Sequence, residues 1–199
     1  MTRRLVDGRF LPVAIAGHPA LELCNTRAGW QSEAIKEYLI DFTALLLWAR
    51  EIGLITPTEA SEMIQAADAA PMRARAVVRK VVQLRAVMYA AFTTGAPEPL
   101  DELRQFVMRA VARSGYRQHG AAVLLDGGAG PLAIVDRCAL QAHRLLEQYG
   151  SQAVGRCGGP DCGWLFLDPT HRRRWCTMAV CGNRAKARRY IQRHRLAAS

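Results

Sequence analysis

Apolar residues recur with helical spacing through most of the first 150 positions. They return every third or fourth residue, which places them on one face of a helix. Thr56-Pro57-Thr58-Glu59 is typical of a helix start, because a hydroxyl N-cap, a proline and a glutamate occupy the positions that satisfy free backbone N–H groups. The pattern predicts a short helix or turn over Pro19–Arg27 and helices over Glu33–Ile52, 57–70, Pro71–Gly95, Leu100–Val111 and Leu132–Tyr149.

Two short apolar stretches have the character of strands instead. One lies between Gly8 and Gly17, where Pro12 would restrict it to a sheet edge, and the other is Ala121–Leu125. The glycine-rich segment 127–130 lacks the Lys-Ser/Thr of a phosphate-binding loop and is interpreted as a turn. These patterns predict a mainly α body (α+β in minor part) with one small strand pair.

The charge balance changes near residue 150. Residues 1–150 carry 17 Lys and Arg against 15 Asp and Glu, whereas residues 151–199 carry 10 against 2. We therefore expect two domains, a helical one over 1–150 and a cationic module over 151–199. A charge excess confined to one module favours a polyanionic partner, with nucleic acid the first candidate.

Four cysteines in that module, Cys157, Cys162, Cys176 and Cys181, form a C-x4-C-x13-C-x4-C array. Two close thiol pairs across a short spacer predict one tetrahedral Zn²⁺. His171 and His194 are alternative ligands. Four thiolates close the coordination shell, and Asp161 and Asp168 are the only acids after residue 150, so the zinc is expected to be structural. The other cysteines, Cys24 and Cys138, are interpreted as core residues.

Around the array, Trp164–Asp168 and Arg172–Cys176 are expected to form a hairpin, and Asn183–Arg195 a helix. Knuckle, hairpin and helix together predict a treble-clef-like zinc module. Because a module of this size buries little hydrophobic core, the metal is expected to supply much of its folding free energy. The candidate nucleic-acid-binding residues are Arg172, Arg173, Arg174, Arg184, Lys186, Arg188, Arg189 and Arg193.

These residues resemble a known family, the CGNR zinc-finger proteins of bacteria, which carry an N-terminal ABATE domain associated with stress-induced transcription regulation. The resemblance rests on the two cysteine pairs, on Trp175-Cys176-Thr177-Met178, on Cys181-Gly182-Asn183-Arg184 with Lys186, and on Asn25-Thr26-Arg27. Glu22-Leu23-Cys24 departs from the more hydrophobic run of the family. The resemblance implies that the four cysteines bind zinc and that the module binds DNA.

The leading hypothesis is a cytoplasmic transcription regulator that contacts double-stranded DNA mainly through phosphates. RNA binding is an alternative, because phosphate contacts do not distinguish the two polymers. The helical domain is expected to form a homodimer or to sense a small-molecule effector, for which Asn25 and Arg27, with His18 and Trp30, are the candidate pocket residues. Neither a catalytic constellation nor a membrane span stands out, so neither enzyme activity nor membrane insertion is expected.

Overall fold

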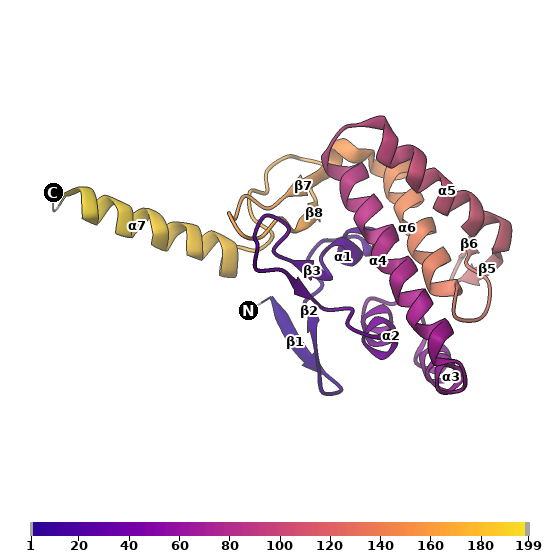
Figure 1. Ribbon diagram of the computed structural model, residues 1–199. Helices are drawn as coiled ribbons and strands as arrows, with labels where there is room; N and C mark the ends of the chain where they lie inside the picture. Colours follow the sequence, from indigo (N-terminus) through magenta and orange to yellow (C-terminus); the bar gives the residue numbers. More distant parts are fainter. Residues whose placement is uncertain (1, 198–199) are drawn as a thin grey trace.

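The computed structural model describes residues 2–197, which form a helical body from which one helix projects (Figure 1). Helix α4 packs against α5, and both contact α6. Helix α1 contacts α4 and α6, while α2 and α3 pack together near the other end of α4. The body helices are α1 (Pro19–Cys24), α2 (Phe42–Glu51), α3 (Pro57–Ala69), α4 (Pro71–Thr93), α5 (Pro97–Arg113) and α6 (Ala133–Tyr149).

Helix boundaries follow their capping residues. Thr56 and Glu59 form the expected capping box at the start of α3. The helix predicted from Glu33 begins only at Phe42, so that prediction is wrong over its first half: the Asp41 carboxylate accepts the N–H of Ala44 at 2.8 Å and starts α2 there. Helix α5 in turn begins three residues earlier than expected, since prolines in a first turn remove no intrahelical hydrogen bond.

The strands form four separate antiparallel pairs among the described residues, where the sequence predicted one small pair in the body. In the first hairpin, Asp7 and Gly8 both have positive φ, as a two-residue type I′ turn requires. The pairs are β1 (Arg3–Val6) with β2 (Arg9–Pro12), β3 (Arg27–Ala28) with β4 (Lys36–Glu37), β5 (Gly115–His119) with β6 (Ala122–Asp126), and β7 (Val154–Arg156) with β8 (Leu165–Leu167).

Two hydrophobic clusters hold the chain together. The larger one fills the helical body and includes Leu165 of β8. The smaller one surrounds the C-terminal cysteines with Trp164 and Phe166, and it includes Tyr38 from the segment before α2. Each cluster therefore takes a residue from the other side of position 150. Burial of apolar surface couples the helical body to the cysteine module.

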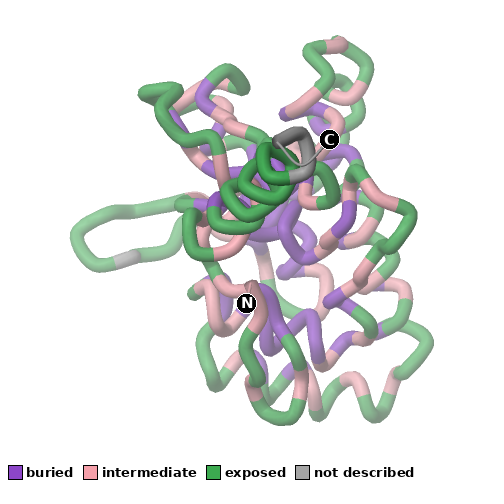
Figure 2. The backbone as a smooth tube through the Cα atoms, turned by 90° about the vertical axis from the view of Figure 1, so that its left-hand side faces the viewer, coloured by how far each residue is buried: buried purple, intermediate pink, exposed green. Residues whose placement is uncertain are grey.

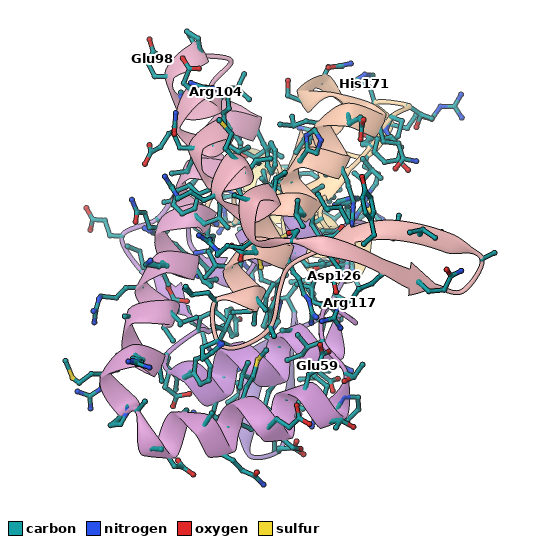
Figure 3. The ribbon with its side chains drawn as sticks, turned by 90° about the vertical axis from the view of Figure 1, so that its right-hand side faces the viewer. Glu59, Glu98, Arg104, Arg117, Asp126 and His171 are labelled. Carbon is teal, nitrogen blue, oxygen red and sulfur yellow. The ribbon has the colours of Figure 1, made fainter. Side chains whose placement is uncertain are left out.

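A buried guanidinium fixes the base of the β5–β6 hairpin. Arg137 of α6 is 6% exposed and bonds the Glu59 carboxylate at 2.7 Å, the Asp126 carboxylate at 2.9 Å and the Leu54 carbonyl at 3.0 Å. Figure 3 shows Glu59, Arg117 and Asp126 gathered where the hairpin joins the body. The Arg137 hydrogen bond lowers the pKa of Glu59 to about 2. A buried charge is stable only when ion pairs and hydrogen bonds compensate for its loss of water, and Arg137 has both.

Helix α7 (Asn183–Ala197) leaves the body almost at once. It extends away from the other elements in Figure 1, and in the view of Figure 2, nearly along its axis, the part whose burial is described is coloured almost entirely as exposed. Of residues 183–194 only Ala185 is partly buried. Within residues 2–197 no helix combines the length and apolarity that crossing a membrane requires.

Candidate metal centre and nucleic-acid interface

The first cysteine pair lies in the turn of the β7–β8 hairpin. The Cys157 N–H bonds the Trp164 carbonyl at 2.8 Å, and the Cys162 N–H bonds the Gly159 carbonyl at 3.0 Å. A Cβ at Gly159 would lie 3.4 Å from Cys181 Sγ and 3.6 Å from Cys157 Sγ. Glycine at this position lets the backbone approach the sulfur atoms closely. The knuckle expected from the glycines around Cys157 is thus present.

The second pair precedes α7. Cys176 ends a loop, and Cys181 lies in the π-helical turn Met178–Gly182, which the Thr177 hydroxyl caps by accepting the Ala179 N–H at 3.1 Å. This turn leads directly into α7. The beginning of the exposed helix is therefore fixed by a residue of the cysteine cluster.

The predicted hairpin of the module is wrong in one strand. Trp164–Asp168 contains strand β8, but Arg172–Cys176 forms no strand, and β8 pairs with β7 instead. The Asp168 carboxylate accepts the backbone N–H groups of Arg172 at 3.1 Å and Arg173 at 2.8 Å, and His171 has positive φ. This capped turn takes the chain away from the sheet before a second strand can form.

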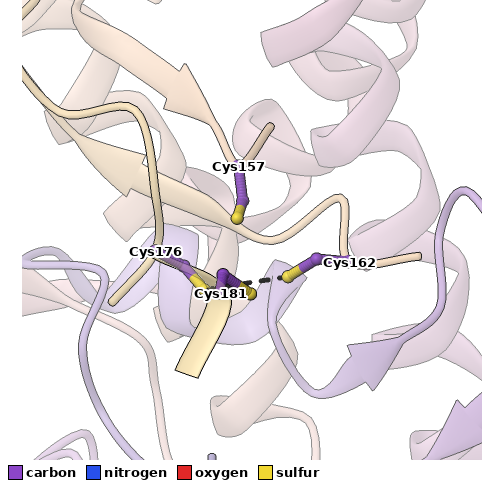
Figure 4. Close-up of side chains that lie close together, drawn as sticks. All are labelled: Cys157, Cys162, Cys176 and Cys181. Atoms are coloured by element: carbon purple, nitrogen blue, oxygen red, sulfur yellow. Dashed lines mark hydrogen bonds between the residues drawn. The ribbon is translucent and has the colours of Figure 1, made fainter. Parts of the chain in front are cut away.

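The four sulfur atoms converge on one point (Figure 4), with all four within 4.8 Å of one another. The Cys162–Cys176 and Cys176–Cys181 sulfur separations are 3.7 and 3.5 Å. A tetrahedron with Zn–S bonds of about 2.3 Å has edges of about 3.8 Å. Cys157, Cys176 and Cys181 are buried and Cys162 is partly exposed. The donor set fits one tetrahedral zinc ion.

The neighbouring thiols favour a thiolate in this cluster. Interaction with the Cys162 and Cys176 side chains lowers the pKa of Cys157. The same pairing raises the pKa of Cys162, because four sulfur atoms so close together cannot all ionise without a cation. A divalent metal replaces the protons and allows four thiolates to coexist.

Comparison with protein families agrees with this geometry. A family model described as "CGNR zinc finger" matches residues 154–194. A second model, ABATE, described as "Putative stress-induced transcription regulator", matches residues 17–155, which is most of the chain. The chain belongs to the ABATE family. No curated protein matches it. In this ABATE protein the four cysteines, Cys157, Cys162, Cys176 and Cys181, are positioned as a set that fits one structural zinc ion.

The predicted nucleic-acid-binding residues divide into three groups. Arg173 turns inward: its guanidinium donates to the Cys176 carbonyl at 2.8 Å and lies over the Phe166 ring. Arg172 and Arg174 lie on the exposed loop before Cys176, and Arg174 contacts the Trp175 ring. The remaining five, Arg184, Lys186, Arg188, Arg189 and Arg193, all lie exposed on α7.

The candidate ligand residues contribute to the contact between body and module. The Asn25 side chain is fully buried, donates to the Leu165 carbonyl at 2.9 Å and accepts the Leu165 N–H at 2.8 Å. The Arg27 carbonyl accepts the Trp164 indole N–H at 2.9 Å. His18 caps α1. The effector pocket at Asn25 and Arg27 stays a prediction, while Asn25 acts as a backbone clamp.

An aromatic stack contributes to the same contact. The Arg27 guanidinium lies over the Trp30 ring, and that ring stacks on Tyr89 with centroids 3.7 Å apart. The Tyr89 hydroxyl then donates to the Gly163 carbonyl at 2.8 Å. The positive φ of Gly163, together with Trp30 and Tyr89 packed against its α carbon, explains why glycine stands there.

Sequence reasoning missed the ion pair beneath this contact. Arg85 of α4 is 2% exposed and bonds the Glu37 carboxylate at 2.7 Å and the Thr26 hydroxyl at 2.9 Å. The pairing lowers the pKa of Glu37 against the opposing effect of burial. The sequence did contain a signal for this ion pair: Arg85 lies among the apolar positions of α4. An arginine near a core needs an acidic partner.

Proposed function

We propose that this ABATE protein binds double-stranded DNA through α7 and acts as a transcription regulator. One observation carries the proposal: a helix without an acidic residue projects from a zinc-anchored module. Its 15 residues span about 22 Å at a rise of about 1.5 Å per residue. The major groove of B-DNA, about 12 Å wide, accommodates one α-helix.

The cations of α7 are arranged in two rows. At 100° per residue, Arg184 and Arg188 share one side of the helix, and Lys186, Arg189 and Arg193 share another. Arg188 pairs with Asp161 of the knuckle at 3.2 Å, so the first row faces the metal centre. The second row lies on the other side of the helix, with only Arg189 also reaching the cavity beside the knuckle, and it is the row that we assign to phosphate oxygens.

An exposed polar and aromatic arc adjoins the outer row. Tyr190 and His194 lie on this arc with their rings 4.2 Å apart, and Ile191 is beside them, about half exposed. Groups able to donate and accept hydrogen bonds, next to an apolar side chain, suit the edges of base pairs. We assign base contacts to this arc and phosphate contacts to the outer row.

The helix gains stability from a polyanion. An isolated helix of this length is marginal in water, and Arg189 and Arg193 repel each other at the i, i+4 spacing. Phosphates on the outer row remove that repulsion. Binding is therefore expected to raise the helical signal in far-ultraviolet circular dichroism.

Fluorescence anisotropy with labelled duplex DNA at several salt concentrations tests the proposal. The zinc-loaded chain is expected to show a linear fall of log K with log salt, and changing Lys186, Arg189 and Arg193 to Gln is expected to reduce the slope by about 3. The matched control changes three exposed cations of α4, Arg73, Arg79 and Lys80, to Gln.

The control variant has the same net charge as the α7 variant and is expected to bind like the wild type. Equal losses in both variants would show a nonspecific charge effect and refute docking by α7. Absence of binding at low salt would refute the proposed function. A structured RNA hairpin titrated in parallel decides between the polymers, because a clear preference for the hairpin would replace DNA by RNA.

A further inference from the structure

A cavity of about 250 Å³ lies beside the metal centre. Its wall consists of the Gly159–Cys162 turn, Arg174 with Trp175, and the first two turns of α7. Only Cys162 and Cys181 of the four ligands reach that wall. The zinc site lies among all four sulfur atoms, so this cavity is a separate space outside the coordination shell.

Two planar side chains form one part of the wall. The Arg174 guanidinium carbon lies 5.1 Å from the Trp175 ring centroid. The indole is half-buried and stands beside the glycine backbone at Gly158 and Gly182, at distances that leave little space for added side chains. The ring is therefore fixed before any ligand arrives. Tryptophan rings and guanidinium planes are the groups on which unpaired nucleobases stack in proteins.

Arginine side chains form the other part of the cavity wall. Arg184, Arg188 and Arg189 reach the cavity from α7, and Asp161 is its only acid. With Arg174, these arginines outweigh both Asp161 and the two net negative charges of a zinc–tetrathiolate centre. Arg184 takes part in no ion pair among residues 2–197. The fork of a guanidinium matches phosphate oxygens.

We propose that this cavity binds a nucleoside 5′-phosphate, with the base against Trp175 and Arg174 and the phosphate on Arg184 and Arg188. The volume is just below the roughly 300–1,000 Å³ of drug-sized pockets, so the cavity suits a ligand group no larger than one nucleotide. A phosphate that takes Arg188 from Asp161 frees that carboxylate to accept an N–H of the base.

Two sources supply this chemistry: a free mononucleotide, or an unpaired nucleotide within nucleic acid held by α7. The second source rests on the proposed function, and the first does not. Occupation by either would fix the α7 N-terminus against the knuckle, because Arg184 and Arg188 belong to the helix and Asp161 to the knuckle.

Titration calorimetry of the zinc-loaded full chain with AMP, GMP and inorganic phosphate tests the first source. A mononucleotide is expected to bind at least tenfold more tightly than phosphate, since stacking adds to the anion contact. Trp175→Leu is expected to remove that advantage and Trp175→Phe to keep most of it. Zinc content and circular dichroism verify that each variant folds. Equal affinity for phosphate and mononucleotides would reduce the cavity to an anion site and overturn the proposal for free nucleotides.

Anisotropy titrations with two duplexes, one fully paired and one with a single unpaired nucleotide, test the second source. The wild type is expected to prefer the second duplex about tenfold, Trp175→Leu to lose the preference, and Trp175→Phe to retain most of it. Lys186→Gln, outside the cavity, is expected to weaken both duplexes equally.

The outcomes separate this proposal from the proposed function. Binding of a mononucleotide but of neither duplex keeps the cavity as an effector site and refutes DNA binding. Equal binding of both duplexes without mononucleotide binding refutes the cavity and keeps DNA binding. An effect of Trp175→Leu that is the same on both duplexes, together with unchanged mononucleotide affinity, also overturns the assignment.

Discussion

Asn25→Ala is expected to destabilise the whole molecule. The Asn25 amide makes two hydrogen bonds to the backbone of Leu165, at 2.9 and 2.8 Å, and both partners are completely buried. Removal leaves one N–H and one carbonyl without a partner, at about 1–3 kcal/mol each. The expected loss is therefore about 2–6 kcal/mol, a large part of the 5–15 kcal/mol typical of a domain.

Urea unfolding of the zinc-loaded protein, followed by circular dichroism and tryptophan fluorescence, measures this loss. To make the fluorescence report on the module, Trp30 and Trp48 of the body are changed to Phe in all proteins compared, which leaves Trp164 and Trp175 as the emitters. Because Leu165 belongs to the main core, the two signals are expected to change together in the wild type.

Asn183→Ala is the matched control, because that exposed amide makes one bond, to the Ala179 carbonyl at 3.3 Å. It is expected to cost less than about 1 kcal/mol. Asn25→Asp keeps an acceptor for the Leu165 N–H but sets a carboxylate against the Leu165 carbonyl, so it is expected to be destabilising as well. A loss below about 1 kcal/mol for Asn25→Ala, or a module that unfolds well before the body in the wild type, would refute the clamp.

Three further predictions concern single side chains. Cys162→Ser is expected to abolish retention of one zinc per chain, measured by metal analysis after dialysis, whereas Cys138→Ser, in the core, is expected to keep it. Burial raises the pKa of Glu22 to about 7. The stability of the wild type relative to Glu22→Gln is therefore expected to fall as pH rises from about 4.5 through 7. A difference in urea unfolding between the two proteins that does not depend on pH would contradict this. The pKa of Glu59 is lowered to about 2. The stability advantage of wild type over Glu59→Gln is therefore expected to be present at pH 7 and to be lost as pH falls from about 4.5 towards 2. An advantage that persists at pH 2 would refute the pairing of Glu59 with Arg137.

Local signals predicted the parts of the fold that depend on local chemistry. Thr56 and Glu59 satisfy one another within four residues, so the start of α3 needs no information from elsewhere. The spacing of the cysteines likewise predicted a common metal centre, because each pair lies within one turn of chain. The cationic helix after Asn183 followed from its composition and spacing.

Tertiary contacts decided the segments that were predicted wrongly. The spacing of Ile35, Tyr38 and Leu39 fits a helix, yet the Tyr38 N–H bonds the Thr26 carbonyl, and the Tyr38 ring joins the cluster at the zinc ligands. Glu37 is likewise held by Arg85, 48 positions away. No window of sequence contains both partners, so propensity could not reveal this pairing.

Strand β7 was missed for a related reason. Val154-Gly155-Arg156 is too short and too glycine-containing to suggest a strand. In the structure, Gly155 pairs with Phe166, whose ring occupies the space that a side chain at position 155 would need. Gly155 weakens the strand signal in the sequence, but its lack of a side chain makes room for the Phe166 ring. The β7–β8 hairpin that results positions the first cysteine pair.

We propose that zinc holds a module whose helix binds nucleic acid. Duplex binding by one preparation, measured zinc-loaded, after chelation and after zinc is restored, tests this proposal when metal content is determined at each stage. We expect salt-dependent binding with one zinc per chain, loss of binding when the metal is removed, and recovery when it returns. Binding that stays unchanged after complete removal of zinc would contradict it.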